Sequence, residues 1–327
     1  MNRNSRLAII IPAYKGLYLE KTLQSFADQT CKDFTLYIGD DQSPDELYEI
    51  VKQFENQIHI EYKKFENNLG GVNLVNQWNR CLEIIKSEDW IWLFSDDDYV
   101  DKICVESFYK NLSIPIKTNI YRFNLQIVDQ DNEEMGGLNR FPENLSAEEF
   151  FEGRIKKNIY SYAVEYIFNR KAFEDVGGFE YFDLCWSTDD ATWIKLARKN
   201  GIATINEGIV YWRYSGINIS SIKNDKSIVL RKLQANLDFL IWSDNFLQRN
   251  NMIVKVSPLD KIKWLLTMPI GTTSLSFSEK IHYLKMSLKK LNMQNLRFAG
   301  TLLIYYGLFK KYIKSTTLSR QFLKTSN

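Results

Sequence analysis

Short apolar runs alternate with segments of helical periodicity over the first hundred residues, and this alternation constrains the fold most. The apolar runs cover residues 7–11, 34–38, 58–62 and 90–94. The helical segments between them lie near residues 19–26, 46–54 and 74–85. Because such short apolar runs are typical of buried strands, the alternation predicts a parallel, doubly wound α/β sheet with right-handed crossovers.

The pattern changes from about residue 118 onward. Strand character is found in residues 119–128, 160–168 and 202–212, and residues 188–199 have the core spacing of a helix. From about residue 227 the chain has a helical pattern throughout. We therefore expect an α/β domain over residues 1–225 and a helical region over residues 226–327.

Charge is divided unevenly between these two parts. Residues 1–225 hold 25 Lys/Arg and 36 Asp/Glu, a balance of −11, whereas residues 226–327 hold 17 and 4, a balance of +13. A basic region of this kind suits nucleic acid or an anionic membrane. Its many aromatic and aliphatic residues favour the membrane.

Two segments of the basic region carry this expectation. Residues 281, 284, 288 and 291 form an apolar stripe, with lysines at 285, 289 and 290 beside it, which predicts a basic amphipathic helix. The apolar stretch 298–309 is shorter than the roughly 20 residues that a transmembrane helix needs. We expect these helices to pack on the α/β body, to touch a membrane surface, or to do both.

The cysteines and the amino-terminal residues indicate in which cellular compartment the protein is expected. The four cysteines are widely spaced and form no Cys-x-x-Cys pair, so a disulfide framework or cysteine zinc site is not expected and a reducing cytosol fits. The polar residues 1–6 lead directly into the first strand, so we expect no signal peptide.

Three consecutive aspartates, Asp96, Asp97 and Asp98, follow the fourth apolar run. Carboxylates this close repel one another unless a cation lies among them, and their oxygens suit Mg²⁺ or Mn²⁺. In open α/β sheets, ligands bind just outside the carboxyl ends of the strands. The run therefore predicts a divalent-metal site, against the simpler alternative of an acidic surface loop.

Polar motifs also follow the first two strands. Pro12, Ala13 and Tyr14 end the first, where an aromatic ring can stack on a nucleobase or simply pack. Asp40 and Asp41 end the second, where carboxylates can accept hydrogen bonds from a base or a ribose. The alternative for this second motif is a turn followed by a helix cap.

Three further motifs are weak when taken singly. Asn68 and the glycines Gly70 and Gly71 precede a helix that contains Asn79, and glycine lets the backbone approach a ligand closely. Asp189 and Asp190 begin a predicted helix, as caps or as catalytic carboxylates. Arg213 is a candidate phosphate ligand. Neither a Walker loop nor a Gly-x-Gly-x-x-Gly motif is present.

In their order and spacing these elements resemble family 2 glycosyltransferases over about residues 5–222. That resemblance implies the GT-A fold, a Rossmann-like, mostly parallel sheet flanked by helices, here with a C-terminal helical appendage. The matching elements are Ile9–Tyr14, Asp40–Asp45, Asn68–Gly71, Trp78–Leu82, Asp96–Asp98 at the Asp-x-Asp position, Gly177–Phe179, and Asp189–Asp190 at the Glu-Asp position.

The resemblance implies a role for each motif. Residues 1–100 would be the nucleotide-sugar-binding half and residues 101–225 the acceptor-side half. Nucleotide-sugar contacts would come from Pro12, Ala13, Tyr14, Asp41, Asn68, Gly70, Asn79, Asp96, Asp97 and Arg213. Acceptor-side contacts would come from Gly178, Phe179 and Trp186.

The implied catalytic groups are carboxylates. Asp96 and Asp98 would hold Mn²⁺ or Mg²⁺, although the closing pair Asp97–Asp98 is an alternative register. Asp190, beside Asp189, would be the general base. The chemistry agrees, because a metal neutralises a leaving diphosphate and a carboxylate can take the proton of the attacking hydroxyl. The chain departs from the family at Asp189, which replaces Glu, and at Ser215, where some members carry a histidine metal ligand.

We therefore expect an inverting glycosyltransferase that moves a sugar from a nucleotide-sugar to a saccharide acceptor. The expected acceptor is polyprenyl-diphosphate-linked, in O-antigen or capsule-type synthesis, with the enzyme cytoplasmic and peripheral at the inner face of a bacterial membrane. No nucleic-acid partner is expected. A sugar nucleotidyltransferase, or a saccharide-binding protein without activity, is the alternative.

Overall fold

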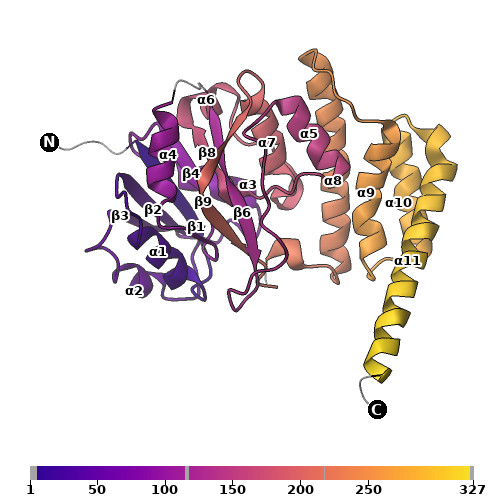
Figure 1. Ribbon diagram of the computed structural model, residues 1–327, viewed down its shortest axis with the longest axis horizontal. Coiled ribbons are helices and arrows are strands. Elements are labelled where there is room, and N and C mark those ends of the chain that lie inside the picture. Colours follow the sequence, from indigo (N-terminus) through magenta and orange to yellow (C-terminus); the bar gives the residue numbers. More distant parts are fainter. Residues whose placement is uncertain (1–5, 115–117, 217, 325–327) are drawn as a thin grey trace. The chain divides into compact units, whose positions relative to one another are not determined.

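The computed structural model describes residues 6–114, 118–216 and 218–324, and the side chains up to residue 313. Residues 1–5, on which the expectation about a signal peptide partly rests, lie outside this range. The chain divides into two compact units (Figure 1). The first unit comprises residues 1–154 and 158–221, and the second comprises residues 155–157 and 222–327.

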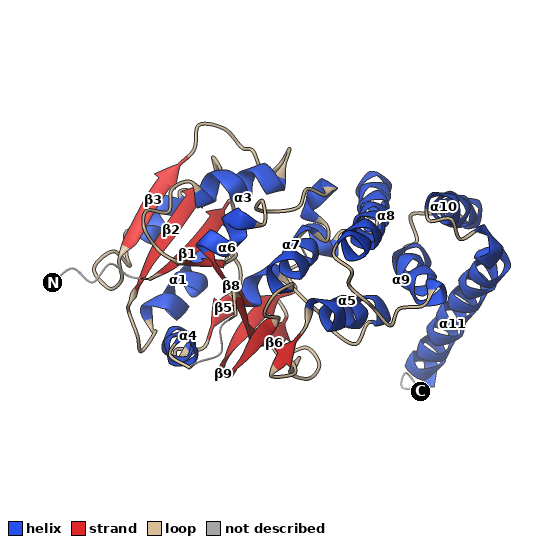
Figure 2. Ribbon diagram, turned by 90° about the horizontal axis from the view of Figure 1, so that it is seen from above, coloured by secondary structure: helices blue, strands red, loops and turns tan. Residues whose placement is uncertain are grey.

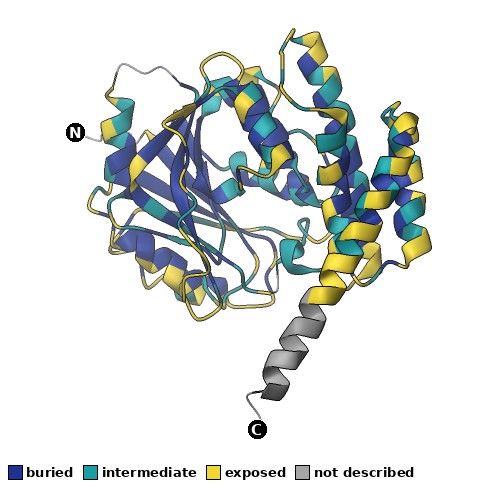
Figure 3. Ribbon diagram, turned by 45° about the vertical axis from the view of Figure 1, so that its right-hand side comes forward, coloured by how far each residue is buried: buried dark blue, intermediate teal, exposed yellow. Residues whose placement is uncertain are grey.

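The first unit contains a single nine-stranded sheet with the order β3-β2-β1-β4-β8-β6-β9-β5, and β7 pairs with β9. Four parallel strands form its first half: β1 (Leu7–Ala13), β2 (Phe34–Asp40), β3 (Ile60–Lys64) and β4 (Trp90–Leu93). The runs of β1, β2 and β4 are buried on both faces, as the inner strands of a parallel sheet require, whereas the edge strand β3 is only partly buried (Figure 3). Ala13 lies opposite Asp40, so the motifs that follow β1 and β2 meet at one edge.

The second half of the sheet is mixed. The strand β8 (Tyr166–Asn169) is antiparallel to both β4 and β6 (Ile120–Val128), whereas β9 (Ile202–Arg213) runs parallel to β6. Two short strands, β5 (Tyr99–Val100) and β7 (Asn144–Leu145), are antiparallel to β9. Six of the nine strands thus share one direction, which confirms the predicted α/β fold with a mostly parallel sheet.

Helices cover both faces of the sheet (Figure 2). One face carries α1 (Leu19–Ala27), α2 (Leu47–Val51) and α4 (Cys104–Leu112), whose apolar residues join the main core around Trp92 and Phe26. The other face carries α3 (Leu74–Leu82), α6 (Arg170–Asp175) and α7 (Thr188–Ala197). The helix α5 (Ala147–Lys156) follows β7.

The strand expected over residues 160–168 is wrong in its first part. Residues Ala163–Glu165 form a 3-10 turn, and β8 begins only at Tyr166. The turn is closed by the buried Glu165, whose carboxylate accepts hydrogen bonds from the Tyr162 N–H at 3.1 Å. A local side-chain bond of this kind competes with strand pairing.

The second unit is helical. It contains α8 (Lys226–Arg249), α9 (Pro258–Gly271), α10 (Phe277–Lys290) and α11 (Arg297–Lys324). Its small core includes Leu266, Leu284 and Ile304. A Cβ on Gly300 would lie 2.7 Å from the Leu284 side chain, so glycine allows α11 to pack closely on α10. Within the described residues, no helix has both the length and the apolar character needed to cross a membrane.

Candidate active site

Asp96 joins the loops that follow β1 and β4. Its Oδ2 accepts hydrogen bonds from the backbone N–H groups of Tyr14 and Lys15, both at 2.8 Å. Burial and the neighbouring Asp97 raise the pKa of Asp96 to about 6. The two N–H groups favour the charged form and lower this pKa, but they do not outweigh burial. Tyr14 itself is exposed beside this contact. The predicted aromatic and acidic motifs therefore meet at the carboxyl edge of the sheet, next to the half-buried Pro12 and the buried Ala13.

Asp98 is buried and binds the end of β9. Its Oδ1 accepts a hydrogen bond from the Arg213 N–H at 2.6 Å. Burial and Asp97 raise the pKa of Asp98 well above its usual value. Asp97 accepts a hydrogen bond from the Ser95 hydroxyl at 2.6 Å, and the Ser215 hydroxyl lies 3.4 Å from its other oxygen. Ser215 thus borders the acidic run.

Arg213 is fully buried, and its guanidinium group binds the protein itself. It donates to the carbonyl oxygens of Asp97 and Asp129 at 2.8 and 3.0 Å and to the Asn132 side chain at 2.8 Å. It also stacks over the Tyr18 ring at 4.2 Å. In this structure Arg213 fixes the backbone of the acidic run, and its expected contact with phosphate stays a prediction.

The acidic run suits a hard divalent cation in its chemistry. Asp96 and Asp98 each present a second carboxylate oxygen beyond the one held by backbone N–H groups. Burial and, after it, the negative charge of Asp97 raise the pKa of Asp98, and Arg213 does not fully offset them. No three His, Cys, Asp or Glu side chains in the described part of the chain are already arranged as a metal site. The residues therefore fit Mn²⁺ or Mg²⁺ as oxygen ligands, without a preformed cage.

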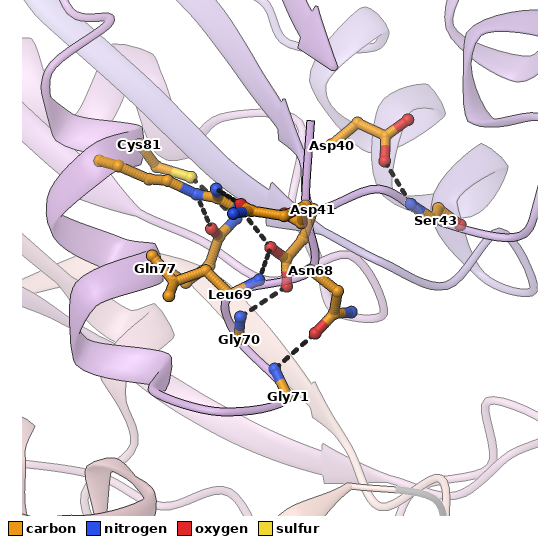
Figure 4. A network of polar contacts seen from close by, with 11 residues as sticks. Asp40, Asp41, Ser43, Asn68, Leu69, Gly70, Gly71, Gln77 and Cys81 are labelled. Carbon is orange, nitrogen blue, oxygen red and sulfur yellow. Dashed lines mark hydrogen bonds and ion pairs between the residues drawn. The ribbon is translucent and has the colours of Figure 1, made fainter. Parts of the chain in front are cut away.

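Asp41 holds the glycine loop that follows β3 (Figure 4). Its Oδ1 accepts the Leu69 N–H and its Oδ2 accepts the Gly70 N–H, both at 2.8 Å. Arg80 of α3 forms an ion pair with the same carboxylate. Because Asp41 is buried and satisfied by these partners, it shapes the loop in this structure, and its expected contact with a base stays a prediction.

The same loop contains two more predicted residues. The Asn68 side chain accepts the Gly71 N–H at 2.8 Å and closes the turn (Figure 4). A Cβ on Gly70 would lie 2.6 Å from the Asp41 carboxylate, so the position requires glycine. Asn79 is exposed on α3 and lies outside this network. Sequence reasoning missed Arg80, although it stands inside the Trp78–Leu82 element that carries the resemblance.

The two aspartates at the start of α7 differ in their surroundings. Asp190 is buried, and its two oxygens accept hydrogen bonds from Arg154 of α5, both at 2.8 Å. Asp189 is half-buried, and burial together with Asp190 raises its pKa to about 7. Sequence reasoning missed Arg154, because nothing in the polar segment before residue 160 marks it.

Tyr162 directly precedes the 3-10 turn before β8 and is half-buried. Its ring stacks on Trp212 of β9, with 4.2 Å between the ring centroids. Burial and Glu165 raise the pKa of Tyr162 to about 12, and the charges of both Arg154 and Asp98 act on its hydroxyl. Arg154, the partner of the predicted base, and Asp98, a predicted metal ligand, therefore both act on this one side chain.

The predicted acceptor-side residues are mainly packing residues here. Phe179 is buried between Trp78 of α3 and Phe173 of α6, at 5.2 and 4.7 Å between ring centroids. Gly178 has a left-handed φ of 70°, and its carbonyl accepts a hydrogen bond from the Lys195 ammonium at 2.7 Å. Trp186 is half-exposed just before α7. Their contact with an acceptor stays a prediction.

Comparison with known structures places the fold in the GT-A class. TarS residues 1–349 of Staphylococcus aureus, solved with UDP-GlcNAc, aligns with a TM-score of 0.63 at 16% identity, covering 95% of this chain and 92% of that one. The mannosyltransferase PcManGT of Pyrobaculum calidifontis, solved with GDP-Man and Mn²⁺, aligns with a TM-score of 0.50 at 12% identity, covering 94% and 88%. At these identities the likeness concerns the fold alone.

The family follows from the sequence comparison. The model of glycosyl transferase family 2 matches residues 8–176, which is more than half of the chain. The chain therefore belongs to glycosyl transferase family 2.

Two curated relatives cover the chain to different extents. TuaG of Bacillus subtilis, named as a teichuronic acid biosynthesis glycosyltransferase, is 26% identical over 224 residues, which is 66% of this chain and 82% of TuaG. The poly(ribitol-phosphate) β-N-acetylglucosaminyltransferase TarS of Staphylococcus aureus is 29% identical over 101 residues, 30% of this chain. That match spans only 17% of TarS, about a sixth of its length.

Proposed function

We propose that this chain is an inverting glycosyltransferase that moves a sugar from a nucleotide-sugar to a saccharide acceptor. The observation that carries the proposal is the meeting of three loops at one sheet edge. There Asp96 binds the loop that carries Tyr14, and Asp98 binds the end of β9. Carboxylates gathered outside the strand ends are placed to receive a nucleotide diphosphate with its cation.

The nucleotide half of the mechanism follows from the loops. Tyr14 is exposed where a base can stack, and the Asp41-held loop presents Gly70 without a side chain. Asp98, with Asp96 or Asp97, would hold Mn²⁺ or Mg²⁺. The ion, when bound, neutralises the charge that develops on the leaving diphosphate.

The acceptor half needs a base. As the acceptor oxygen attacks the anomeric carbon, a carboxylate of the Asp189–Asp190 pair takes the hydroxyl proton. One direct displacement inverts the anomeric centre and requires no nucleophile from the protein. Neither His59 nor His282 belongs to the site motifs, so a carboxylate is the fitting base.

Donor and acceptor are proposed from chemistry and from the relatives. TarS was solved with UDP-GlcNAc, and TuaG is named for teichuronic acid synthesis. We take a UDP-linked hexose or N-acetylhexosamine as the donor class. The acceptor we propose is a bacterial surface polysaccharide intermediate linked to polyprenyl diphosphate, used at the cytoplasmic face of the membrane.

An apolar stripe on α11 supports contact with that membrane. The stripe consists of exposed residues at a spacing of three or four: Phe298, Leu302, Tyr305, Phe309 and Tyr312. Exposed lysines flank it on α11 at 310 and 311, and α10 adds lysines at 285, 289 and 290. An apolar stripe with basic neighbours fits the surface of an anionic bilayer.

The proposal is tested by ligand-dependent stability and by product analysis. Nucleotide-sugars should raise the melting temperature of the protein, and Mn²⁺ should increase this effect, because a ligand that binds only the native state stabilises it. Turnover with an acceptor should release a nucleoside diphosphate. Release of pyrophosphate would instead identify a sugar nucleotidyltransferase, and binding without any turnover would identify a saccharide-binding protein.

A further inference from the structure

A groove lies on the first unit between helix α1 and strand β5, and none of the motifs described above lines it. Its volume is about 670 Å³, within the roughly 300–1,000 Å³ of typical small-ligand sites. One wall is formed by α1 and its C-cap, which contribute Lys21, Gln24 and Asp28. The other wall comes from β5, from the segment that follows it, and from β9. This wall is the only part of the groove that is aromatic.

Two tyrosines form the aromatic wall. Tyr99 of β5 and Tyr211 of β9 lie opposite each other on the paired strands, and their rings stack with 4.5 Å between centroids and 7° between ring planes. The Lys21 ammonium lies 5.0 Å from the centroid of the Tyr99 ring. Both tyrosines are half-buried and line the groove. They therefore supply a rigid apolar surface at the edge of the sheet.

Two carboxylates in the groove are held in place by neighbouring side chains. The Gln24 amide donates a hydrogen bond to Oδ1 of Asp28 at 2.7 Å, and the Tyr211 hydroxyl donates to Oδ1 of Asp101 at 3.1 Å. Each carboxylate has a second oxygen that can accept a hydrogen bond from a ligand. Because these oxygens are already oriented, a ligand loses less affinity to the ordering of side chains.

The charges of the groove cancel, which indicates the chemistry of its ligand. Lys21 and Lys102 contribute two positive charges, and Asp28 and Asp101 contribute two negative ones. A phosphate or a nucleotide needs an excess of cations, so it is disfavoured here. A neutral sugar fits, because each of its hydroxyl groups both donates and accepts hydrogen bonds and therefore suits ammonium and carboxylate groups side by side. The apolar C–H groups of its ring can pack on the tyrosines.

We propose that this groove is a second saccharide site, which binds a neutral sugar segment outside the active site. The inference goes beyond the proposed transfer reaction and does not depend on it. Tyr99 directly follows Asp98 in the chain. The Arg213 guanidinium, which donates to the Asp97 carbonyl, lies 5.6 Å from the centroid of the Tyr99 ring. A saccharide chain bound in the groove therefore lies within one layer of side chains of the acidic run.

Binding of neutral tetrasaccharides to the full chain tests the proposal, without donor or metal. The probes are cellotetraose, maltotetraose and tetra-N-acetylchitotetraose, measured by saturation-transfer NMR and calorimetry. The groove variant Asp28→Ala/Lys102→Ala removes one exposed charge of each sign, and the control Glu49→Ala/Lys52→Ala removes an exposed ion pair of α2. The native chain and the control should bind at least one probe equally well. The groove variant should bind it about tenfold more weakly, the effect of one or two lost hydrogen bonds.

The location of the bound sugar is checked separately. Amide hydrogen exchange of residues 99–102 should slow when the probe binds, and Asp98→Ala should bind the probe as the native chain does. The inference is wrong if no probe binds up to about 10 mM, if the groove variant binds like the control, or if binding is lost in Asp98→Ala and kept in the groove variant. It is also wrong if inorganic phosphate displaces the sugar. A chain that binds sugar in the groove but transfers none contradicts the proposed function and leaves this site standing.

Discussion

Replacing Gly70 by alanine tests how the Asp41 carboxylate holds the glycine loop. A Cβ at this position would lie 2.6 Å from Asp41 Oδ2, the oxygen that accepts the Gly70 N–H. To reach normal contact the oxygen must retreat by roughly 0.8 Å. It cannot do so freely, because Arg80 and the Leu69 N–H hold the same carboxylate. The hydrogen bond from Gly70 then exceeds any useful length.

The magnitude follows from two opposing effects. Losing a hydrogen bond to a charged group costs about 1.5–3 kcal/mol. Alanine restores about 0.4–1 kcal/mol by restricting the unfolded chain. The net loss in the free energy of unfolding is about 1–2 kcal/mol, or about 3–6 °C in the melting temperature of a unit of this size. Nucleotide affinity should fall as well, because the loop moves.

Gly137→Ala is the matched control. No atom lies within 4 Å of the Cβ that it would add, and its backbone is not left-handed. Its melting temperature should stay equal or rise slightly. Thermal unfolding followed by circular dichroism, with nucleotide titrations by calorimetry, makes the comparison. If Gly70→Ala unfolds like Gly137→Ala, the carboxylate does not hold the loop as described.

The remaining predictions concern the metal, the ion pair in the loop and the stripe. Asp98→Ala should abolish transfer and weaken Mn²⁺-dependent nucleotide binding in calorimetry; unchanged binding would contradict its role as a ligand. Arg80→Met leaves Asp41 without its cation and should lower the free energy of unfolding by about 2–3 kcal/mol in denaturant titrations, since breaking a buried pair costs about 3–5 and Arg80 is partly exposed. The double variant Phe298→Ser/Phe309→Ser should no longer float with phosphatidylglycerol vesicles in a density gradient, whereas the control Leu230→Ser on α8 should still do so. If the two variants float equally, the α11 stripe does not bind the membrane.

The strands β1, β2 and β4 could be predicted because their residues are largely apolar and are buried on both faces. Runs such as residues 7–11 have few other places in a water-soluble fold than the centre of a sheet. The direction of β8 could not be predicted. Its run, Tyr166–Asn169, reads the same in a parallel or an antiparallel pair, and only its neighbours β4 and β6 decide. The turn closed by Glu165 could not be predicted either, because it depends on where the Glu165 side chain lies in space.

Sequence alone determined which residue types stand at the ends of the strands, and so the class of chemistry. Short apolar runs must be buried, and the polar residues that follow each run must then meet at one edge of the sheet. Tertiary structure decided the partners of these residues. Arg80 pairs with Asp41, Arg154 pairs with Asp190, and the guanidinium group of Arg213 binds backbone carbonyl oxygens rather than carboxylates.

These pairings arise between residues tens of positions apart, where no periodicity links them in the sequence. An ion pair depends on where two side chains end in space, within a few ångströms, and that is set by the packing of whole helices on the sheet. The two adjacent aspartates of α7 show the consequence. They are alike in sequence, but the approach of α5 makes Asp190 the partner of an arginine, whereas burial and the charge of Asp190 raise the pKa of Asp189.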